Sequence, residues 1–290
     1  MPWFEALGFI VFGFAVGTYG SMIGAGGGFL IVPLLLFLGN TGRIAAGTSL
    51  AVVLLNASSS TVSYLRQRRV DIKSALIFSL AGIPGSLLGA YTVQHVPHRV
   101  FTILFGIILV LVAVRAFITR DRTAAAEDAP ADLDAPADIE EPTPIPARRP
   151  GRPARDFVDA MGVRHTYDFN LWGAIGVSAA NGFLASMFGI GGGVIQVPAM
   201  VYLFGFPAHI AVATSQLVIV ITAAFGTATH AFYGDVLWLQ ALLLGVGAIA
   251  GAQLGAHLAS RMQPGPLMRW FSLAVLFAAL YLIYTSINKH

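Results

Sequence analysis

Hydrophobic residues along this chain form long apolar runs that contain almost no charged side chains. The runs fall into two blocks of five, one on each side of a polar stretch, and four runs in each block are long enough to cross a membrane. A spanning helix needs roughly 20 apolar residues for a hydrocarbon core about 30 Å thick. The pattern predicts an all-α polytopic membrane protein with segments at 3–24, 28–38, 44–65, 72–95 and 99–119, then 169–189, 193–204, 208–232, 236–260 and 266–287.

The two shortest segments each follow a glycine-rich motif. Residues 21–28 read Ser-Met-Ile-Gly-Ala-Gly-Gly-Gly, and residues 186–193 read Ser-Met-Phe-Gly-Ile-Gly-Gly-Gly. Each short segment also contains a proline, Pro33 in the first block and Pro198 in the second. Glycine and proline both disfavour the interior of a helix. We therefore expect each motif to break the helical structure and each short segment to be a half-helix or part of a discontinuous helix.

The two blocks match each other beyond the glycine motifs. Equivalent positions are 165 residues apart at the glycines and 166 residues apart further on, so one residue is inserted near Gly205. The further matches are Val32-Pro33 with Val197-Pro198, Thr48-Ser49 with Thr214-Ser215, and Gly85 and Gly89 with Gly251 and Gly255. This period is far longer than the roughly 20–50 residues of solenoid repeats. The sequence therefore predicts a duplication of a whole five-segment membrane unit.

Composition agrees with a membrane location. The chain of 290 residues is 56% hydrophobic and 11% charged, whereas soluble domains carry about 25% charged residues. The net charge is +3, but the basic residues form no stripe interleaved with aromatic side chains, so we expect no nucleic-acid partner. The sequence contains no cysteine, which excludes disulfides and thiolate chemistry.

The polar stretch at 120–168 has a composition of its own. It contains seven of the fifteen prolines and eleven of the fourteen acidic residues. Such a segment buries too little apolar surface to offset its chain entropy, and we expect it to be a disordered, acidic, Pro/Ala-rich linker. The predicted domains are therefore an N-terminal membrane repeat at 1–119, the linker at 120–168, and a C-terminal membrane repeat at 169–290.

Basic loops predict the orientation of the two blocks. The loop from Arg66 to Lys73 follows the third segment of the first block, whereas Arg261 and Arg269 follow the fourth segment of the second. The positive-inside rule places basic loops, and here also the linker, in the cytoplasm. Four spans per block in the same orientation would put Arg261 and Arg269 outside. We therefore expect an inverted repeat of five segments.

The predicted membrane interior lacks buried charge, because Glu5, Asp71 and Asp235 all lie near segment ends. A carboxylate-based proton relay is therefore not expected. A substrate must instead be held by backbone groups and neutral donors. The N-termini of half-helices carry unpaired N–H groups and partial positive charge, and glycine lets the backbone approach a ligand closely. We expect a small anion to bind where the two glycine motifs converge.

The candidate substrate-binding residues are the glycine motifs and neutral polar side chains near them: Ser21, Gly24, Gly26, Gly27, Gly28, Thr48, Ser49, Ser186, Gly189, Gly191, Gly192, Gly193, Gln196, Thr214, Ser215 and Gln216. Two alternatives remain open. The glycine motifs can serve helix packing, and Ser and Thr hydroxyls can bond their own helix backbone. Asn56 and His230 are expected to link helices, and Tyr64 to lie at the membrane interface. No catalytic, metal or cofactor site is expected.

The duplicated Gly-x-Gly-Gly-Gly-x-x-x-Val-Pro pattern, at 24–33 and 189–198, resembles the TauE/SafE family of sulfite exporters. The Thr-Ser pairs fit the same resemblance, which covers nearly the whole chain except the linker. It implies a secondary transporter for sulfite, a sulfonate or a related organosulfur anion, in the inner membrane of a bacterium. An anion-selective channel that uses the same half-helix N-termini is the alternative. The coupling ion, the direction of transport and the oligomeric state, including a homo-oligomer, stay open.

Overall fold

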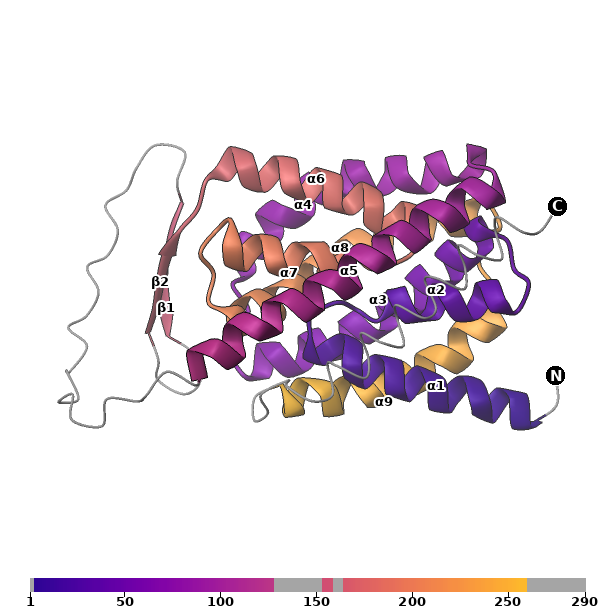
Figure 1. Cartoon of the computed structure of the whole chain (residues 1–290), viewed down its shortest axis with the longest axis horizontal. Coiled ribbons are helices and arrows are strands. Elements are labelled where there is room, and N and C mark those ends of the chain that lie inside the picture. Colours follow the sequence, from indigo (N-terminus) through magenta and orange to yellow (C-terminus); the bar gives the residue numbers. More distant parts are fainter. Residues whose placement is uncertain (1–2, 128–152, 159–163, 260–290) are drawn as a thin grey trace.

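Figure 1 shows the computed structural model, which describes residues 3–127, 153–158 and 164–259 as a helical bundle with a small sheet at one end. The helices are α1 (Trp3–Met22), α2 (Gly28–Phe37), α3 (Gly42–Arg66), α4 (Ile72–Thr92), the 3-10 helix η1 (Val93–His95), α5 (His98–Glu127), α6 (Leu171–Phe188), α7 (Gly193–Tyr202), α8 (Ala208–Phe232) and α9 (Trp238–Leu258). Strands β1 (Ala154–Val158) and β2 (Arg164–Asp168) form an antiparallel pair with Ala154 opposite Asp168.

Six helices within the described ranges are long and apolar enough to cross a membrane, namely α1, α3, α4 with η1, α6, α8 and α9. This confirms the prediction of a polytopic α-helical membrane protein. Helices α2 and α7 have ten residues each, and at about 1.5 Å per residue they are too short to cross. In α5, the apolar stretch His98–Leu111 is likewise shorter than the candidate spans. The segment expected at 266–287 lies outside the described residues.

The stretch expected to be a linker holds regular structure at both ends. Helix α5 continues to Glu127, past the boundary expected at 119, and strands β1 and β2 lie within residues 154–168. The strands contain Phe157, Val158, Thr166 and Tyr167, residue types that favour strands. The composition of the whole stretch concealed these short runs. The rest of the linker, at 128–152 and 159–163, lies outside the described residues.

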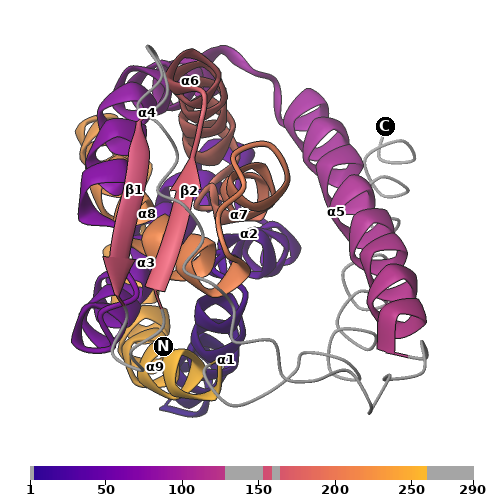
Figure 2. The same cartoon turned by 90° about the vertical axis from the view of Figure 1, so that its left-hand side faces the viewer.

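Two pairs of parallel helices, α1 with α9 and α4 with α6, lie on opposite sides of the bundle (Figures 1 and 2). Their backbones approach closely at glycines. A Cβ atom on Gly85 would lie 2.0 Å from the carbonyl oxygen of Ala179, and one on Gly251 would lie 2.1 Å from that of Phe14. Small residues four apart allow membrane helices to pack this closely. These matched glycines of the two blocks therefore serve helix packing.

Helices α3 and α8 lie side by side between those pairs and run antiparallel (Figure 2). Ser60, near the end of α3, donates a 3.0 Å hydrogen bond to Oε1 of Gln216, near the start of α8. Thr48, near the start of α3, accepts a 3.0 Å hydrogen bond from the backbone N–H of Leu237, just beyond the end of α8. Of the six candidate spans these two are the most buried, so they form the centre on which the glycine motifs pack.

Candidate functional site

Each glycine motif forms a loop between a long helix and a short one. Glycine loop 1 (residues 23–27) joins α1 to α2, and glycine loop 2 (residues 189–192) joins α6 to α7. The last residues of the loops, Gly27 and Gly192, have left-handed backbones with φ of 84° and 79°, and neither short helix has a side-chain cap. Glycine adopts this conformation without strain. The first N–H groups of an α-helix have no partner within it, so both short helices begin with uncapped N-termini.

The two glycine loops pack directly against each other. A Cβ atom on Gly193 would lie 1.8 Å from the carbonyl oxygen of Gly24, and one on Gly28 would lie 2.2 Å from that of Gly189. Any side chain at these two positions would collide with backbone of the other block. The structure therefore brings the two glycine motifs together, and their junction is made of main chain. Val53 of α3 covers it, since its Cγ1 atom lies 3.0 Å from a Cβ built on Gly26.

Hydroxyl groups from the central helices hold carbonyl groups of the loops. Ser49 donates to the carbonyl oxygen of Gly189 at 2.7 Å, and Ser215 donates to that of Gly24 at 3.1 Å. All four residues are buried. A carbonyl oxygen carries partial negative charge and would repel an anion. The two hydroxyl groups donate their hydrogens to these oxygens. The arrangement thus favours backbone N–H groups, rather than the Ser49 and Ser215 hydroxyls, as the donors that contact a ligand.

The end of α1 is fastened by two polar side chains of α3. Asn56 donates to the carbonyl oxygen of Gly26 at 3.0 Å and accepts a 3.2 Å hydrogen bond from the hydroxyl of Ser21. Tyr64 donates to the carbonyl oxygen of Ser21 at 2.9 Å and is 1% exposed. Tyr64, expected at the membrane interface, is buried within the protein near the end of α3. Its place near the end of an apolar segment did not reveal that it would form a buried cluster with Ala213 of α8 and Ala256 of α9.

The end of α6 has different partners in the second block. His230, which is 166 residues after Tyr64, places its Nε2 atom 3.1 Å from the carbonyl oxygen of Ser186. The hydroxyl of Ser186 is buried and has no hydrogen-bond partner. Its counterpart Ser21 bonds to Asn56, but the position equivalent to Asn56 holds Thr222, whose hydroxyl bonds to its own helix. The two blocks therefore differ in polarity beside their glycine loops.

The two glutamines predicted as ligands lie in separate hydrogen-bonded contacts. Gln196 accepts a 3.0 Å hydrogen bond from Nδ2 of Asn181, and Gln216 accepts one of 3.0 Å from Ser60. Both glutamine side chains are fully buried. The Nε2 atom of Gln216 has no partner, so this amide keeps a donor for a ligand.

Thr48 and Thr214 were predicted to bind the substrate. Among the described residues, their hydroxyl groups form no hydrogen bond with the glycine loops. Thr48 accepts from the backbone N–H of Leu237 and Thr214 from that of Asp71, each at 3.0 Å. Leu237 and Asp71 are the N-cap residues of α9 and α4. Both threonines therefore fix the start of a helix from the other block, a role that their spacing in the sequence did not reveal.

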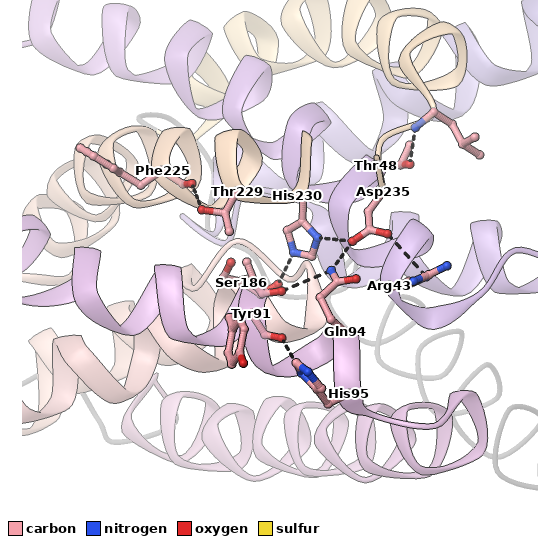
Figure 3. Close-up of polar contacts among 12 residues, drawn as sticks. Arg43, Thr48, Tyr91, Gln94, His95, Ser186, Phe225, Thr229, His230 and Asp235 are labelled. Carbon is pink, nitrogen blue, oxygen red and sulfur yellow. Dashed lines mark hydrogen bonds and ion pairs between the residues drawn. The ribbon is translucent and has the colours of Figure 1, made fainter. Parts of the chain in front are cut away.

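A charged cluster lies where α3 begins and α8 ends (Figure 3). Asp235 is 2% exposed. One carboxylate oxygen contacts Nδ1 of His230 at 3.4 Å and accepts from Gln94, and the other lies 3.6 Å from Nε of Arg43. Burial raises the pKa of Asp235, but the hydrogen bonds from His230 and Gln94 and the charges of His230 and Arg43 outweigh it, so the pKa falls below its usual value.

This cluster was missed in the sequence because its members come from four separate segments. Two members gave separate signals, Asp235 as one of three acidic residues outside the linker and His230 as a residue expected to link helices. Across the described ranges, no group of three or more His, Cys, Asp and Glu side chains could hold a metal ion.

Comparison with known proteins agrees with the membrane architecture. The family model for the sulfite exporter TauE/SafE matches residues 9–282. The probable membrane transporter protein YunE of Bacillus subtilis (strain 168) is 36% identical over 286 residues, which are 96% of this chain and 97% of YunE. A probable membrane transporter protein of Xylella fastidiosa (strain Temecula1) is 30% identical over 94% of this chain and 92% of its own.

A plant protein matches a shorter part. The sulfite exporter TauE/SafE family protein 6 of Arabidopsis thaliana is 36% identical over 96 residues, 33% of this chain and 22% of its own. No solved structure matches the chain. The family and these relatives are transporters rather than enzymes. With its six candidate spans, this chain is a multi-pass membrane protein that belongs to the sulfite exporter TauE/SafE family.

Proposed function

We propose that this protein is a secondary transporter of a small sulfur-containing oxyanion, such as sulfite, a sulfonate or a related organosulfur anion. The main support for this proposal is the junction of the two glycine loops. There Gly193 packs against the backbone of Gly24, and Gly28 packs against the backbone of Gly189. The substrate binds at this junction, near the middle of the membrane, and the two blocks give it access to each side in turn. The match to the sulfite exporter family supports the class of substrate.

The chemistry of the junction suits an oxyanion. Helix N-termini offer N–H donors and partial positive charge, and two uncapped N-termini belong to α2 and α7. Consecutive N–H groups next to left-handed residues also form anion-binding nests. Ser49 and Ser215 keep carbonyl oxygens of the loops occupied. Gln216 retains an unpartnered buried amide nitrogen on α8, so a bound anion gains a further donor without any cation.

Alternating access rests on an inverted repeat of the two blocks. The antiparallel arrangement of α3 and α8 supports it, as do the pairs α1 with α9 and α4 with α6, each of which joins one helix from each block. With the basic loop at 66–73 inside, this topology puts the linker in the cytoplasm and the protein in the inner membrane of a bacterium. A lipid bilayer and a small anion are then its partners.

Uptake of radiolabelled sulfite into proteoliposomes tests the proposal, with unlabelled sulfite, sulfonates, sulfate and acetate as competitors. We expect saturable uptake that sulfur oxyanions block and acetate does not. Unlabelled sulfite trapped inside should accelerate entry of the label, because a carrier exchanges its substrate. An anion-selective channel would instead pass current without saturation or counterflow. Absence of sulfite and sulfonate flux under every imposed gradient would overturn the proposed substrate class.

A further inference from the structure

His230 is buried between two hydrogen-bond acceptors. Its Nε2 atom lies 3.1 Å from the carbonyl oxygen of Ser186, and its Nδ1 atom lies 3.4 Å from a carboxylate oxygen of Asp235. Figure 3 shows the ring between these two groups. The side chain of His230 is fully buried. A neutral imidazole carries one N–H, whereas an imidazolium carries two. Only the protonated ring can donate to both acceptors.

Loss of the proton from His230 would therefore break one of these contacts. The negative charge of Asp235 retains the remaining N–H on Nδ1, since a hydrogen bond to a carboxylate is stronger than one to a neutral carbonyl. Nε2 would then present a lone pair to the carbonyl oxygen of Ser186, and two facing acceptors repel. Ser186 lies in the last turn of α6, directly before glycine loop 2. The charge on His230 thus acts on the backbone that leads into the proposed substrate site.

The equivalent position in the first block has a donor that keeps its proton. Tyr64 donates to the carbonyl oxygen of Ser21 at 2.9 Å, and both residues match His230 and Ser186 in the duplicated sequence. The ordinary pKa of tyrosine is about 10, whereas histidine titrates between about pH 5 and 8. The donor at the end of α1 is therefore a hydroxyl, whereas the donor at the end of α6 is an imidazole nitrogen that carries a proton, while Nδ1 donates to Asp235, only in the protonated ring.

The surroundings of His230 contain few other charges. Asp235 lies in the loop after α8, and Arg43 of α3 faces the other oxygen of that carboxylate. Gln94 of η1 is uncharged and contacts the same carboxylate. On α6 the ring contacts the carbonyl oxygen of Ser186, which is uncharged. The remaining titratable groups on η1 and the start of α5 are exposed, namely His95, His98 and Arg99. Asp235 and Arg43 are thus the charged residues whose contacts with the ring or with its carboxylate partner are described.

We propose that His230 is a proton-binding site whose charge sets the position of the Ser186 carbonyl and thereby of glycine loop 2. Its coupling to transport rests on the proposed function, in which glycine loop 2 holds the substrate, and makes the proton the coupling ion. The expectation that this protein has no carboxylate-based proton relay considered only carboxylates deep within the spans. Here the carboxylate lies at a helix end, and the proposed proton-binding group is the histidine beside it.

Thiol labelling tests the proton site without any substrate. The chain has no cysteine, so Ser186→Cys introduces a single reactive thiol beside glycine loop 2. Ser21→Cys is the matched control, because Tyr64 beside it does not titrate. The ratio of the two rates removes the shared pH dependence of thiol reactivity. We expect the Ser186→Cys to Ser21→Cys ratio to rise several-fold from about pH 5 to about pH 8, and to stay constant in a His230→Gln background.

A constant ratio in the parent background, or the same rise with His230→Gln, would overturn the proton site. If Ser186→Cys does not fold, Ile190→Cys with Ala25→Cys repeats the comparison at equivalent loop positions, and the same outcomes apply.

Proton movement measured with a trapped pH indicator tests the coupling in proteoliposomes. A sulfite gradient should move protons with the parent protein, and with His230→Gln sulfite exchange should lose its dependence on pH. A pH-dependent labelling ratio without sulfite flux would uphold the proton site and reject the proposed substrate. Sulfite counterflow with a constant ratio would uphold the transporter and reject the proton site.

Discussion

Ser49 donates a 2.7 Å hydrogen bond to the carbonyl oxygen of Gly189, which lies 140 residues further along the chain. Ser215 makes the equivalent contact in the other direction, to the carbonyl oxygen of Gly24 at 3.1 Å. Each central helix is therefore tied to the glycine loop of the opposite block. A movement of either central helix must displace a loop of the other block, or break the hydrogen bond that connects them.

Ser49→Ala is expected to lower stability by about 1–3 kcal/mol, because it leaves the buried carbonyl of Gly189 without this donor. The midpoint of thermal unfolding in detergent measures the effect. Ser58→Ala is the matched control on the same helix, since the hydroxyl of Ser58 bonds only to the carbonyl of Leu54. Equal midpoints for the two variants would show that the Ser49 contact contributes nothing to the junction.

Gly27→Val is expected to abolish transport while the protein still inserts in the membrane. The backbone φ at Gly27 is +84°, and a Cβ there would lie 2.6 Å from Cγ1 of Val16. Gly39→Val isolates the effect of the backbone conformation, since Gly39 has the same φ and open space around its Cβ position. The second loop offers the same test with Gly192→Val.

Uptake into proteoliposomes and the yield of monodisperse protein are the two measurements for these variants. We expect Gly39→Val to transport and Gly27→Val not to do so at equal incorporation. Full transport by both Gly27→Val and Gly192→Val would remove the support for a glycine-lined anion site.

Gly182→Val is expected to prevent the close packing of α6 against α4. A Cβ on Gly182 would lie 2.2 Å from the carbonyl oxygen of Gly82, whereas one on Gly176, on the same helix, would have no atom within 4 Å. Gly176→Val therefore carries a similar cost in helix propensity without the collision. The folded yield in detergent should fall for Gly182→Val and stay near that of the parent for Gly176→Val. The reverse order would contradict the observed helix pairing.

Tyr167→Phe tests whether strand β2 is fastened to the membrane bundle. The hydroxyl of Tyr167 donates to the carboxylate of Asp71 at 2.8 Å, and the same carboxylate caps α4 through the N–H of Ser74. Hydrogen bonds to charged groups contribute about 1.5–3 kcal/mol, so the variant should unfold at a lower temperature. Proteolysis between residues 153 and 170 should also become faster. Unchanged proteolysis and stability would indicate that the strand does not depend on this contact.

The lowered pKa of Asp235 predicts acid sensitivity. The folded protein binds this proton less tightly than the unfolded chain, in which Asp titrates near about 3.9. The carboxylate therefore stabilises the fold above that pH, and the stabilisation is lost as the pH falls through the lower folded-state pKa. Unfolding midpoints should fall more steeply below about pH 4 in the parent protein than in Asp235→Asn. Parallel curves would contradict a stabilising role for this charge.

The sequence alone determined the class of the protein and the location of its breaks. Long uncharged runs predict spanning helices because the bilayer penalises unpaired polar groups. The two glycine motifs predict where helices stop because glycine destabilises a helix locally. Both signals depend on neighbouring residues, so they can be recognised without knowing the fold. The duplication likewise predicted that Gly24 and Gly189 are equivalent.

Only the tertiary structure decided which side chains meet. Ser49 and Ser215, which stay predicted substrate contacts, donate to carbonyl oxygens of the opposite glycine loops. Thr48, also a predicted contact, accepts from the backbone N–H of Leu237, the N-cap residue of α9. The partners of His230 come from α6 and from the loop after α8. A helix that is apolar on every face gives no amphipathic signal of which side is buried. The register between distant helices therefore follows from packing at glycines and buried hydrogen bonds, which no local pattern in the sequence reveals.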